Sequence, residues 1–271
     1  MTGDHISPPP ASTPEFRWCT DEYLLLEWDA PIDLSLVMTT LQSEQVIRES
    51  LGEAIMDSLA GWSTVLLRLT RATEGTERVE YRIRDALQSA EGVESEFASR
   101  KVTVPVKYGG DCGPDLEFVA GCNGIDIPEA IERLSRSTHF SGMVSFTPGM
   151  ANCLWVEAEL ALSAPKYESP RTTTPEGTVG LGGSSIAMYS LPSPGGFQMI
   201  GTAAVPLYRA GGIEVNGVVS PALFQPGDRI TLRSVTIDEY LELRERAARD
   251  EYDYEVEPGV ARISGGTVTW T

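Results

Sequence analysis

Glycine and proline recur between short β-rich runs throughout the second half of the chain, and this pattern restricts the fold more than any other feature. Runs this short, separated by turn residues, suit a closed or nearly closed β-barrel better than any helical fold. Beyond Ser141 we expect strands at residues 144–146, 178–181, 186–191, 197–200 and 229–235. One helix is expected after these strands, in the segment IDEYLELRERAARDEY, which Thr236 and Glu239 open.

The first third of the chain alternates between strand-like and helix-like runs. Residues 23–28 predict a buried strand, and Asp33 can cap a helix whose apolar residues recur at helical spacing. Residues 55–59 and 62–69 predict a second strand pair, and residues 78–87 predict a second helix. Strands that alternate with helices over about eighty residues indicate a small α+β sandwich of the ferredoxin type.

A new unit begins with the segment RKVTVPVKY, residues 100–108, which is β-branched and alternating and therefore predicts a strand. The turn GGD at residues 109–111 follows, and two short helices come after it. Asp126 and Glu129 form a capping box at the start of the second of these helices.

Four segments are therefore expected along the chain. They are a proline-rich disordered leader at residues 1–15, a ferredoxin-like α+β domain at 16–100, a β-barrel domain with its C-terminal helix at 101–250, and an extended C-terminal arm at 251–271.

The net charge of −18 limits the partners that this chain can have. It offers no cationic surplus to replace the counterions around phosphate groups, which argues against nucleic acid and equally against anionic membranes. We find no signal peptide and no run of about 20 apolar residues that could span a bilayer. We therefore expect a cytoplasmic protein.

The cysteines and histidines give no metal-binding pattern. The four cysteines, Cys19, Cys112, Cys122 and Cys153, show no CxxC spacing, and the chain has only two histidines. A zinc cluster is not expected from such a set, so we predict no metal site and reduced, mostly buried thiols.

Five blocks of the sequence resemble one family, and they occur in the same order. They are VPVKYGGDCGPDLEFVA (104–120), FSGMVSFTPGM (140–150), PKYESPRTTTPEGTVGLGG (165–183), SLPSPGGFQMIGTA (190–203) and LFQPGDRITL (223–232). The chain resembles, over about residues 16–250, the carboxyltransferase half-domain family. That family includes the 5-oxoprolinase B subunit, allophanate hydrolase subunit 1, the Kip-type inhibitor of a sporulation kinase, and part of urea carboxylase.

Within this family the block at residues 165–183 is most similar to the urea carboxylase branch. The resemblance implies a ferredoxin-like N-terminal domain joined to a cyclophilin-like β-barrel, an α+β fold overall. One turn departs from the family pattern. It reads Met150 to Leu154 after its glycine, where relatives commonly carry Phe-Pro-Tyr.

The resemblance implies a subunit of a heteromeric enzyme that acts on a small urea, amide or lactam. The site would be completed by a homologous second half-domain subunit, so the isolated chain should be inactive. As a carboxyltransferase it would receive carboxybiotin from another chain, with biotin carboxylase and biotin carrier proteins as further partners. Alternatives are a 5-oxoprolinase-type lactam hydrolase that uses ATP, and a non-enzymatic inhibitor of a histidine kinase. No cofactor is expected to be bound covalently, since the chain lacks the Met-Lys-Met context of a biotin site and an ATP-grasp region.

Arg171 is the first candidate for catalysis, because a guanidinium can grip a carboxylate or carbamate with two hydrogen bonds and stays charged in any environment. The alternative is a structural arginine that ties loops together. His139 and Asp111 are further catalytic candidates, each with a structural alternative. Asp115, beside Pro114, is interpreted as a negative charge in the first turn of a helix, where it interacts favourably with the helix dipole.

The candidates for substrate binding lie in three places. An amide and a phenol suit recognition of a urea, and glycine runs can expose backbone N–H groups to an oxyanion or can serve close packing at barrel corners. Residues at the end of a strand that precedes a helix are common in binding and catalytic sites. The candidates are Gln198 and Tyr189, the glycines Gly182, Gly183, Gly195 and Gly196, and the strand-end residues Lys107 and Tyr108.

Overall fold

The computed structural model describes residues 13–70, 75–90, 95–264 and 267–271. The chain forms two compact units, one containing Met1–Ser99 and Gly259–Thr271 and the other containing Arg100–Pro258. The predicted disordered leader lies outside the described residues except for its last three positions.

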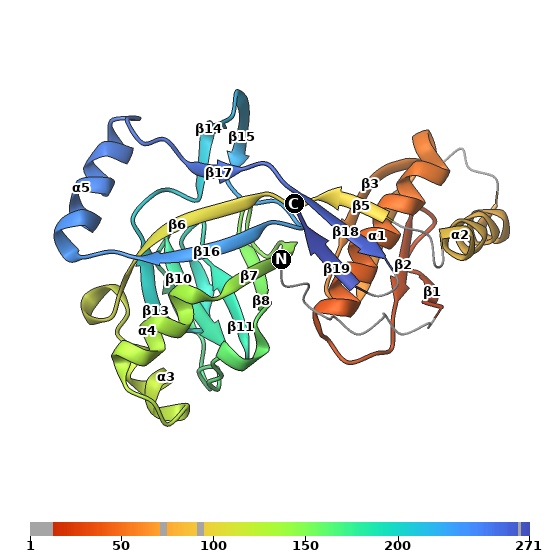
Figure 1. Ribbon diagram of the computed structural model, residues 1–271. Coiled ribbons are helices and arrows are strands. Elements are labelled where there is room, and N and C mark those ends of the chain that lie inside the picture. The colour runs from red at the N-terminus through yellow and green to blue at the C-terminus, as the bar shows by residue number, and fades with distance from the viewer. Residues whose placement is uncertain (1–12, 71–74, 91–94, 265–266) are drawn as a thin grey trace. The chain divides into compact units, whose positions relative to one another are not determined.

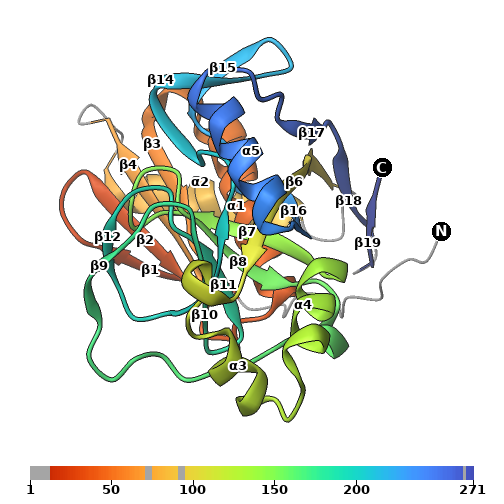
Figure 2. The same cartoon turned by 90° about the vertical axis from the view of Figure 1, so that its left-hand side faces the viewer.

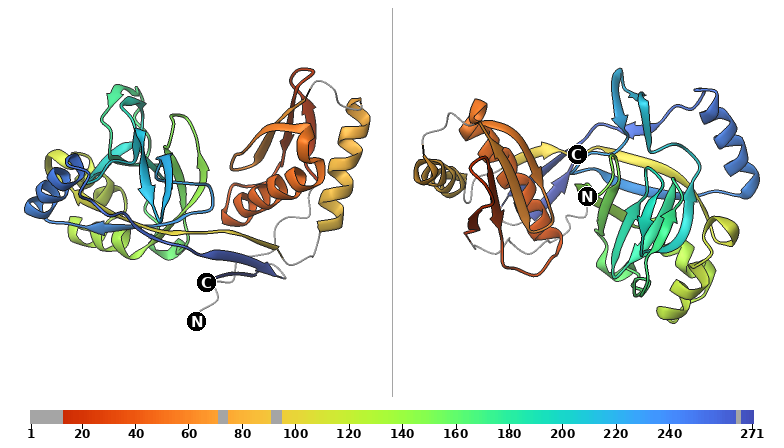
Figure 3. Two further views of the ribbon diagram at one scale, coloured as in Figure 1. Left: turned by 90° about the horizontal axis from the view of Figure 1, so that it is seen from above. Right: turned by 180° about the vertical axis from the view of Figure 1, so that it is seen from behind.

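The first unit contains a four-stranded antiparallel sheet in the order β1-β2-β4-β3. Its strands are β1 (Glu15–Trp18), β2 (Tyr23–Glu27), β3 (Ile55–Ala60) and β4 (Thr64–Leu69). Helix α1 (Leu34–Leu51) packs against β3 and β4, and helix α2 (Thr76–Ala90) packs beside α1, as Figure 3 shows. Apolar residues alternate along β2 and β4, so that one face of the sheet carries the buried side chains of the unit.

A three-stranded sheet made of β5 and two C-terminal strands completes the first unit. Strand β5 (Ser95–Ala98) pairs with β18 (Val260–Ser264), which in turn pairs with β19 (Thr267–Trp270). The segment predicted as a single extended arm, residues 251–271, is thus divided between the units, because β17 (Glu255–Glu257) pairs with a strand of the second unit. In the first unit the strand beside β2 is the N-terminal β1, while β5 lies in the separate three-stranded sheet.

The second unit is built on a closed β-barrel (Figure 1). Its sheet runs β13-β10-β11-β8-β7-β16-β6, and β13 also pairs with β6, which closes the ring, while β17 continues from β6. The ring pairs are antiparallel except for β16 with β6. The ring consists of β6 (Lys101–Tyr108), β7 (Thr138–Val144), β8 (Ala151–Trp155), β10 (Thr178–Gly182), β11 (Ser185–Met188), β13 (Gln198–Ala203) and β16 (Arg229–Ser234).

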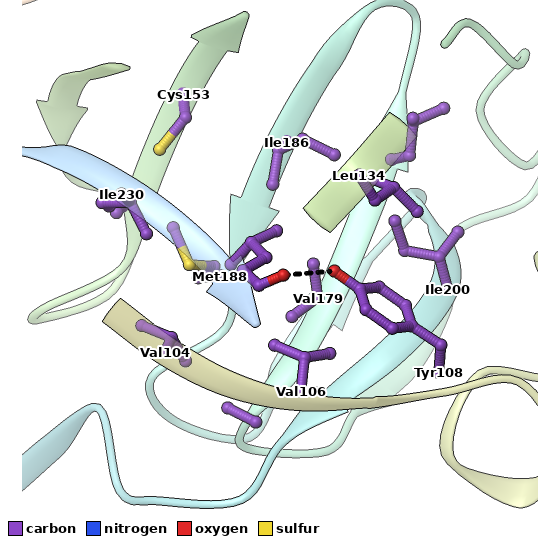
Figure 4. Packing of buried hydrophobic residues seen from close by; sticks show 14 of the residues in the cluster. Val104, Val106, Tyr108, Leu134, Cys153, Val179, Ile186, Met188, Ile200 and Ile230 are labelled. Carbon is purple, nitrogen blue, oxygen red and sulfur yellow. Dashed lines mark hydrogen bonds between the residues drawn. The ribbon is translucent and has the colours of Figure 1, made fainter. Parts of the chain in front are cut away.

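Side chains that alternate along the strands fill the barrel. Val102, Val104, Val106 and Tyr108 occupy every second position of β6 and are all buried. Figure 4 shows part of this core, in which Tyr108 points among apolar side chains from the other strands.

Three helices pack on the outside of the barrel. Helix α3 (Leu116–Cys122) contacts β13, α4 (Ile127–Arg136) contacts β16, and α5 (Ile237–Ala248) contacts β6. The predicted caps are confirmed, since Asp126 accepts the N–H of Glu129 at 2.8 Å and Thr236 accepts that of Glu239 at 3.2 Å.

Two strand pairs stand apart from the barrel sheet. Strand β9 (Arg171–Thr174) pairs with β12 (Ser193–Gly195), and β14 (Tyr208–Val215) pairs with β15 (Val218–Ala222). Figure 2 shows β9 and β12 side by side as a narrow ribbon. We refer to β9 and β12 together as the β9–β12 ribbon.

Two local expectations are wrong. The strand predicted at residues 144–146 is the end of β7, which stops at Val144, because Phe146 has a positive φ of 74° that ends the extended run. The thiols are free, but Cys19 and Cys122 are exposed and Cys153 is buried, so the cysteines are not mostly buried. Cys19 lies in the turn before β2, and Cys122 is the last residue of α3.

The α+β fold class and the closed barrel are confirmed. In the described part of the chain, no helix has both the length and the apolar character needed to cross a membrane.

Candidate functional site

Arg171 is the first residue of β9 and is held in place by its neighbours on two sides. Its Nη2 donates to the carbonyl of Phe197 at 2.5 Å. Its guanidinium carbon lies 4.5 Å from the centroid of the Tyr167 ring, a cation–π contact. The side chain is 22% exposed, so it is largely removed from water while its charge is retained.

Asp115, just before α3, is the carboxylate beside this arginine. Its Oδ1 accepts from the hydroxyl of Tyr167 at 2.6 Å and its Oδ2 accepts from the N–H of Met199 at 2.6 Å. The Nη1 of Arg171 lies 3.9 Å from Oδ2, too far for a hydrogen bond. The hydrogen bond to Asp115 is the largest of the effects that raise the pKa of Tyr167.

The guanidinium of Arg171 has donors that are not used in hydrogen bonds within the described structure. Its Nε and Nη1 are buried and have no hydrogen-bond partner among the described residues. A buried donor without a partner costs about 1–3 kcal/mol, and more when it is charged. Each of these nitrogens can donate to an oxygen of an anion such as a carboxylate, a carbamate or a phosphate, and the positive charge of the guanidinium attracts that anion.

The segment before Arg171 is fastened to the start of β13. Gln198 donates from Nε2 to the carbonyl of Pro165 at 2.7 Å, and the N–H of Tyr167 donates to the carbonyl of Gly196 at 2.7 Å. The ammonium group of Lys166 lies 4.6 Å from the centroid of the Phe197 ring. The side chain of Gln198 therefore positions the segment that precedes Arg171.

Tyr189 follows β11 and lies close to the same arginine. Burial raises the pKa of its phenol, and the positive charge of Arg171 opposes that rise. Its ring packs in a small cluster with Met150, Ala187 and Phe197. Met150 belongs to the turn whose sequence departs from the family pattern, so that turn contributes a side chain to this cluster.

The glycines at this end of the barrel allow close packing. A Cβ on Gly182 would lie 2.7 Å from a ring carbon of Phe197, and one on Gly195 would lie 2.4 Å from the hydroxyl oxygen of Tyr189. Gly183 has a positive φ of 61° and donates its N–H to the carbonyl of Ala164 at 2.8 Å. These contacts support the packing interpretation of the glycines; Gly196 contributes the carbonyl that accepts from Tyr167.

The strand-end candidates lie elsewhere. Tyr108 is 2% exposed in the barrel core, and its hydroxyl faces the carbonyl of Leu232 at 3.5 Å (Figure 4). Burial raises its pKa far above the usual range. Lys107 donates from Nζ to the carbonyl of Tyr108 at 2.5 Å, and Asp111 is exposed in the 3₁₀ turn η2 (Gly110–Cys112). We leave these three residues out of the candidate site.

His139 is also placed outside the candidate site. It lies in β7 and is completely buried, with Nε2 3.2 Å from the carbonyl of Leu134 and its ring in edge contact with Trp155. Burial lowers its pKa to about 4. A neutral histidine packed in this way is a structural residue of the strand.

The candidate site therefore contains Arg171, Asp115, Tyr167, Tyr189 and Gln198. Sequence analysis selected three of these, but it assigned Asp115 to helix electrostatics and did not single out Tyr167. Over the described ranges, no group of three or more His, Cys, Asp or Glu residues could hold a metal ion.

Comparison with known proteins gives one family. The family model for the carboxyltransferase domain, subdomain C and D, matches residues 14–214. The 5-oxoprolinase B subunit of Bacillus subtilis is 32% identical over 56% of this chain and 60% of its own length. The putative urea carboxylase of Emericella nidulans is 26% identical over 89% of this chain and 22% of its own length.

Solved structures share the fold. The urea carboxylase of Kluyveromyces lactis superposes with a TM-score of 0.80 over 95% of this chain and 25% of that protein, at 18% identity. The present chain spans about 60% of the length of the 5-oxoprolinase subunits and a smaller share of the urea carboxylases.

Proposed function

Because the chain belongs to the carboxyltransferase domain family, subdomain C and D, we propose that it supplies one half of a composite active site. A homologous half-domain subunit supplies the other half. The assembled enzyme acts on a small urea, amide or lactam, and the isolated chain has no turnover.

One observation carries this proposal. Arg171 presents two buried nitrogens, Nε and Nη1, whose N–H groups lack partners within the described structure, although a carboxylate lies close by. The two oxygens of Asp115 are occupied by Tyr167 and Met199. The arginine therefore keeps donors for a second anion, and a carboxylated substrate or product offers one.

Each residue of the site has its own role in binding. Arg171 holds the carboxylate and neutralises the charge that gathers on its oxygens during transfer. The ring of Tyr167 covers the guanidinium and limits the access of water, and Gln198 fixes the segment that carries this ring.

Carboxyl transfer to a urea-type nitrogen is the favoured reaction. Carboxybiotin, brought by a carrier protein that a biotin carboxylase has charged, would supply the activated carboxyl group. The donor set of Arg171 fits a carboxylate of this kind, which is why we retain biotin on another chain as the cofactor.

Lactam hydrolysis with ATP is the second candidate, and the 32% identity to the 5-oxoprolinase B subunit favours it. A lactam that carries a carboxylate would use Arg171 in the same way. Avidin distinguishes the two reactions, because it sequesters biotin and should stop carboxyl transfer while leaving lactam hydrolysis unchanged.

Substitution of Arg171 tests the binding role. In the enzyme assembled with its companion subunit, Arg171→Gln should lower kcat/KM by about 10–100-fold, the range for loss of charge-assisted hydrogen bonds. Arg133→Gln is the matched control, since the Arg133 side chain is 29% exposed and pairs with Glu129 on the surface of α4. Equal kcat/KM for both variants, at an unchanged melting temperature, would contradict the role of Arg171.

A further inference from the structure

The segment just before β9 covers the guanidinium of Arg171. Residues 165–170 lie in no helix or strand and lead directly into β9 (Figure 2). Five of these six residues are exposed, and the exception is Tyr167, whose ring centroid lies 4.5 Å from the guanidinium carbon of Arg171. We refer to residues 165–170 as the strap. Its one half-buried side chain is thus the one that lies over the arginine.

Polar contacts of its backbone and side chains fasten the strap to neighbouring segments. Two are hydrogen bonds of the backbone, one is a hydrogen bond of the Tyr167 phenol, and one is a cation–π contact. They join Pro165 to Gln198, Tyr167 to Gly196 and to Asp115, and Lys166 to Phe197. Each such contact contributes modestly in water, so the strap can detach while the barrel stays folded.

Both ends of the strap are anchored. Ala164, just before it, exchanges two backbone hydrogen bonds with Gly183, at N···O distances of 2.8 and 3.0 Å. Arg171, just after it, begins β9, where its register partner is Gly195. The part that can move is therefore limited to residues 165–170.

Access to Arg171 depends on a segment that can move. Its Nε and Nη1 are buried and have no partner within the described residues, and its Nη2 donates to the carbonyl of Phe197. An anion therefore cannot reach the unused donors until a neighbouring group moves. Asp115 accepts from the N–H of Met199 in β13, a strand of the barrel ring. Tyr167 instead belongs to the exposed strap, so it is the neighbour that leaves most easily.

We propose that the strap is a lid, which opens to admit a small carboxylate or a related anion to Arg171 and then closes over it. In the closed state the Tyr167 ring keeps water from the guanidinium, which strengthens the attraction between its charge and the anion. The hydrogen bond from the Tyr167 hydroxyl then occupies Asp115, which leaves the arginine to the anion. This inference rests on the proposed function for the role of Arg171, and it adds the step that controls access to that residue.

Amide hydrogen exchange, measured by NMR on the purified full chain, tests the lid. The N–H of Tyr167 reports the strap, because it donates to the carbonyl of Gly196. The N–H of Gly183 reports the anchor, because it donates to the carbonyl of Ala164. Local opening predicts that the protection factor of the Tyr167 amide is at least about tenfold lower than that of the Gly183 amide.

Gln198→Met removes the hydrogen bond to Pro165 and should loosen the strap. The protection factor of the Tyr167 amide should fall by about fivefold, while that of the Gly183 amide stays unchanged. Thr202→Val is the matched control, because Thr202 lies on the same strand, β13, and its hydroxyl donates to a backbone carbonyl outside the strap. It should leave the Tyr167 amide as well protected as in the wild-type chain.

Lys166→Ala loosens the strap without a change in the core. Lys166 is exposed, and the substitution removes its contact with the Phe197 ring. The protection factor of the Tyr167 amide should fall by about twofold. Because this change lies on the surface, it keeps the test decisive if Gln198→Met lowers the protection of both amides.

An anion should hold the lid closed. Sodium acetate is the probe, and it is compared with sodium chloride at equal concentrations. Acetate should raise the protection factor of the Tyr167 amide by at least about twofold, because a ligand that binds the closed state lowers the population of the open state. Arg171→Gln should abolish this increase. The Nε–H resonance of Arg171 should shift with acetate, which reports binding at the guanidinium itself.

Several results would overturn the inference. One is a Tyr167 amide as well protected as the Gly183 amide in the wild-type chain. Another is unchanged protection of Tyr167 in both Gln198→Met and Lys166→Ala. If acetate shifts the Arg171 Nε–H resonance without raising the protection of Tyr167, the lid fails and the role of Arg171 stands. If acetate does not shift that resonance, the role of Arg171 fails, and the lid fails with it because it has no anion to cover.

Discussion

At the scale of single residues, the candidate site depends on how Asp115 is shared. A carboxylate next to a guanidinium normally takes its donors in a bidentate pair. Here the Tyr167 hydroxyl and the Met199 N–H occupy the two oxygens, and Arg171 Nη1 remains 3.9 Å away. We therefore infer that Tyr167 is a positioning residue that keeps the arginine available for a ligand.

Tyr167→Phe tests this arrangement. Loss of the phenol frees Oδ1 of Asp115, which can then pair with Arg171 and compete with the substrate carboxylate. In the assembled enzyme, KM should rise by about three- to tenfold while kcat changes little.

Asp115→Asn provides the control for that experiment, because an uncharged amide cannot capture the arginine. In the Asp115→Asn background, Tyr167→Phe should have no further effect on KM, so the double variant should match the single Asn variant. Independent, additive effects of the two substitutions on KM would show that Tyr167 acts by another route.

Sequence alone identified part of this site and missed part of it. Arg171 and Gln198 fall in blocks that resemble the family, and Tyr189 was selected as a phenol on a predicted strand. Asp115 also lies in one of these blocks, but it looked like an ordinary residue at a helix start. Its contact with Tyr167 joins residues 52 positions apart, which no local pattern predicts. Tyr108 could have been excluded, since it continues the buried alternation of Val102, Val104 and Val106.

At the scale of elements, local chemistry predicted helix starts better than strand partners. Asp33, Asp126 and Thr236 each accept an N–H three residues onward, so the signal lies within four residues of sequence. The pairings of β5 with β18 and of β9 with β12 join distant segments. Nothing in the strand sequences themselves specifies these partners, because alternation fixes a face and not a neighbour.

Strand β7 yields a prediction about pH, because His139 is buried in it as a neutral ring. Its folded pKa of about 4 lies below the ordinary value of about 6.5 that applies in the unfolded chain. As the pH falls from about 6.5 to about 4, His139 therefore binds a proton in the unfolded chain but stays neutral in the folded chain. The free energy of unfolding should decrease over that window, by at most about 1.4 kcal/mol per pH unit, and this contribution is fully present above it.

His139→Leu should remove that contribution to the pH dependence. Urea unfolding of both chains at several pH values between 4 and 7 gives the slope of the unfolding free energy against pH for each. The difference between the two slopes is the contribution of His139, because the acidic residues are the same in both chains. Parallel pH profiles for the wild-type chain and the variant would mean that the histidine is not excluded from protonation in the folded state.

At the scale of the whole molecule, the chain spans only part of the proteins that it resembles. It covers about 60% of the 5-oxoprolinase subunits and 25% of the Kluyveromyces lactis urea carboxylase to which it is similar. Under the proposed function, the described residues would contribute Arg171 and the contacts that support it, which bind and orient the substrate. The groups that activate the substrate are expected from other chains.

The most direct test of the half-site proposal compares turnover by this chain, by its companion half-domain subunit, and by the two mixed. The assay should include ATP, bicarbonate and the biotin-carrying proteins, with urea and 5-oxoproline as substrates in separate reactions. We predict that neither subunit alone turns over either substrate, and that the mixture turns over one of them. Turnover by the isolated chain at a rate comparable with that of the mixture would contradict the proposal.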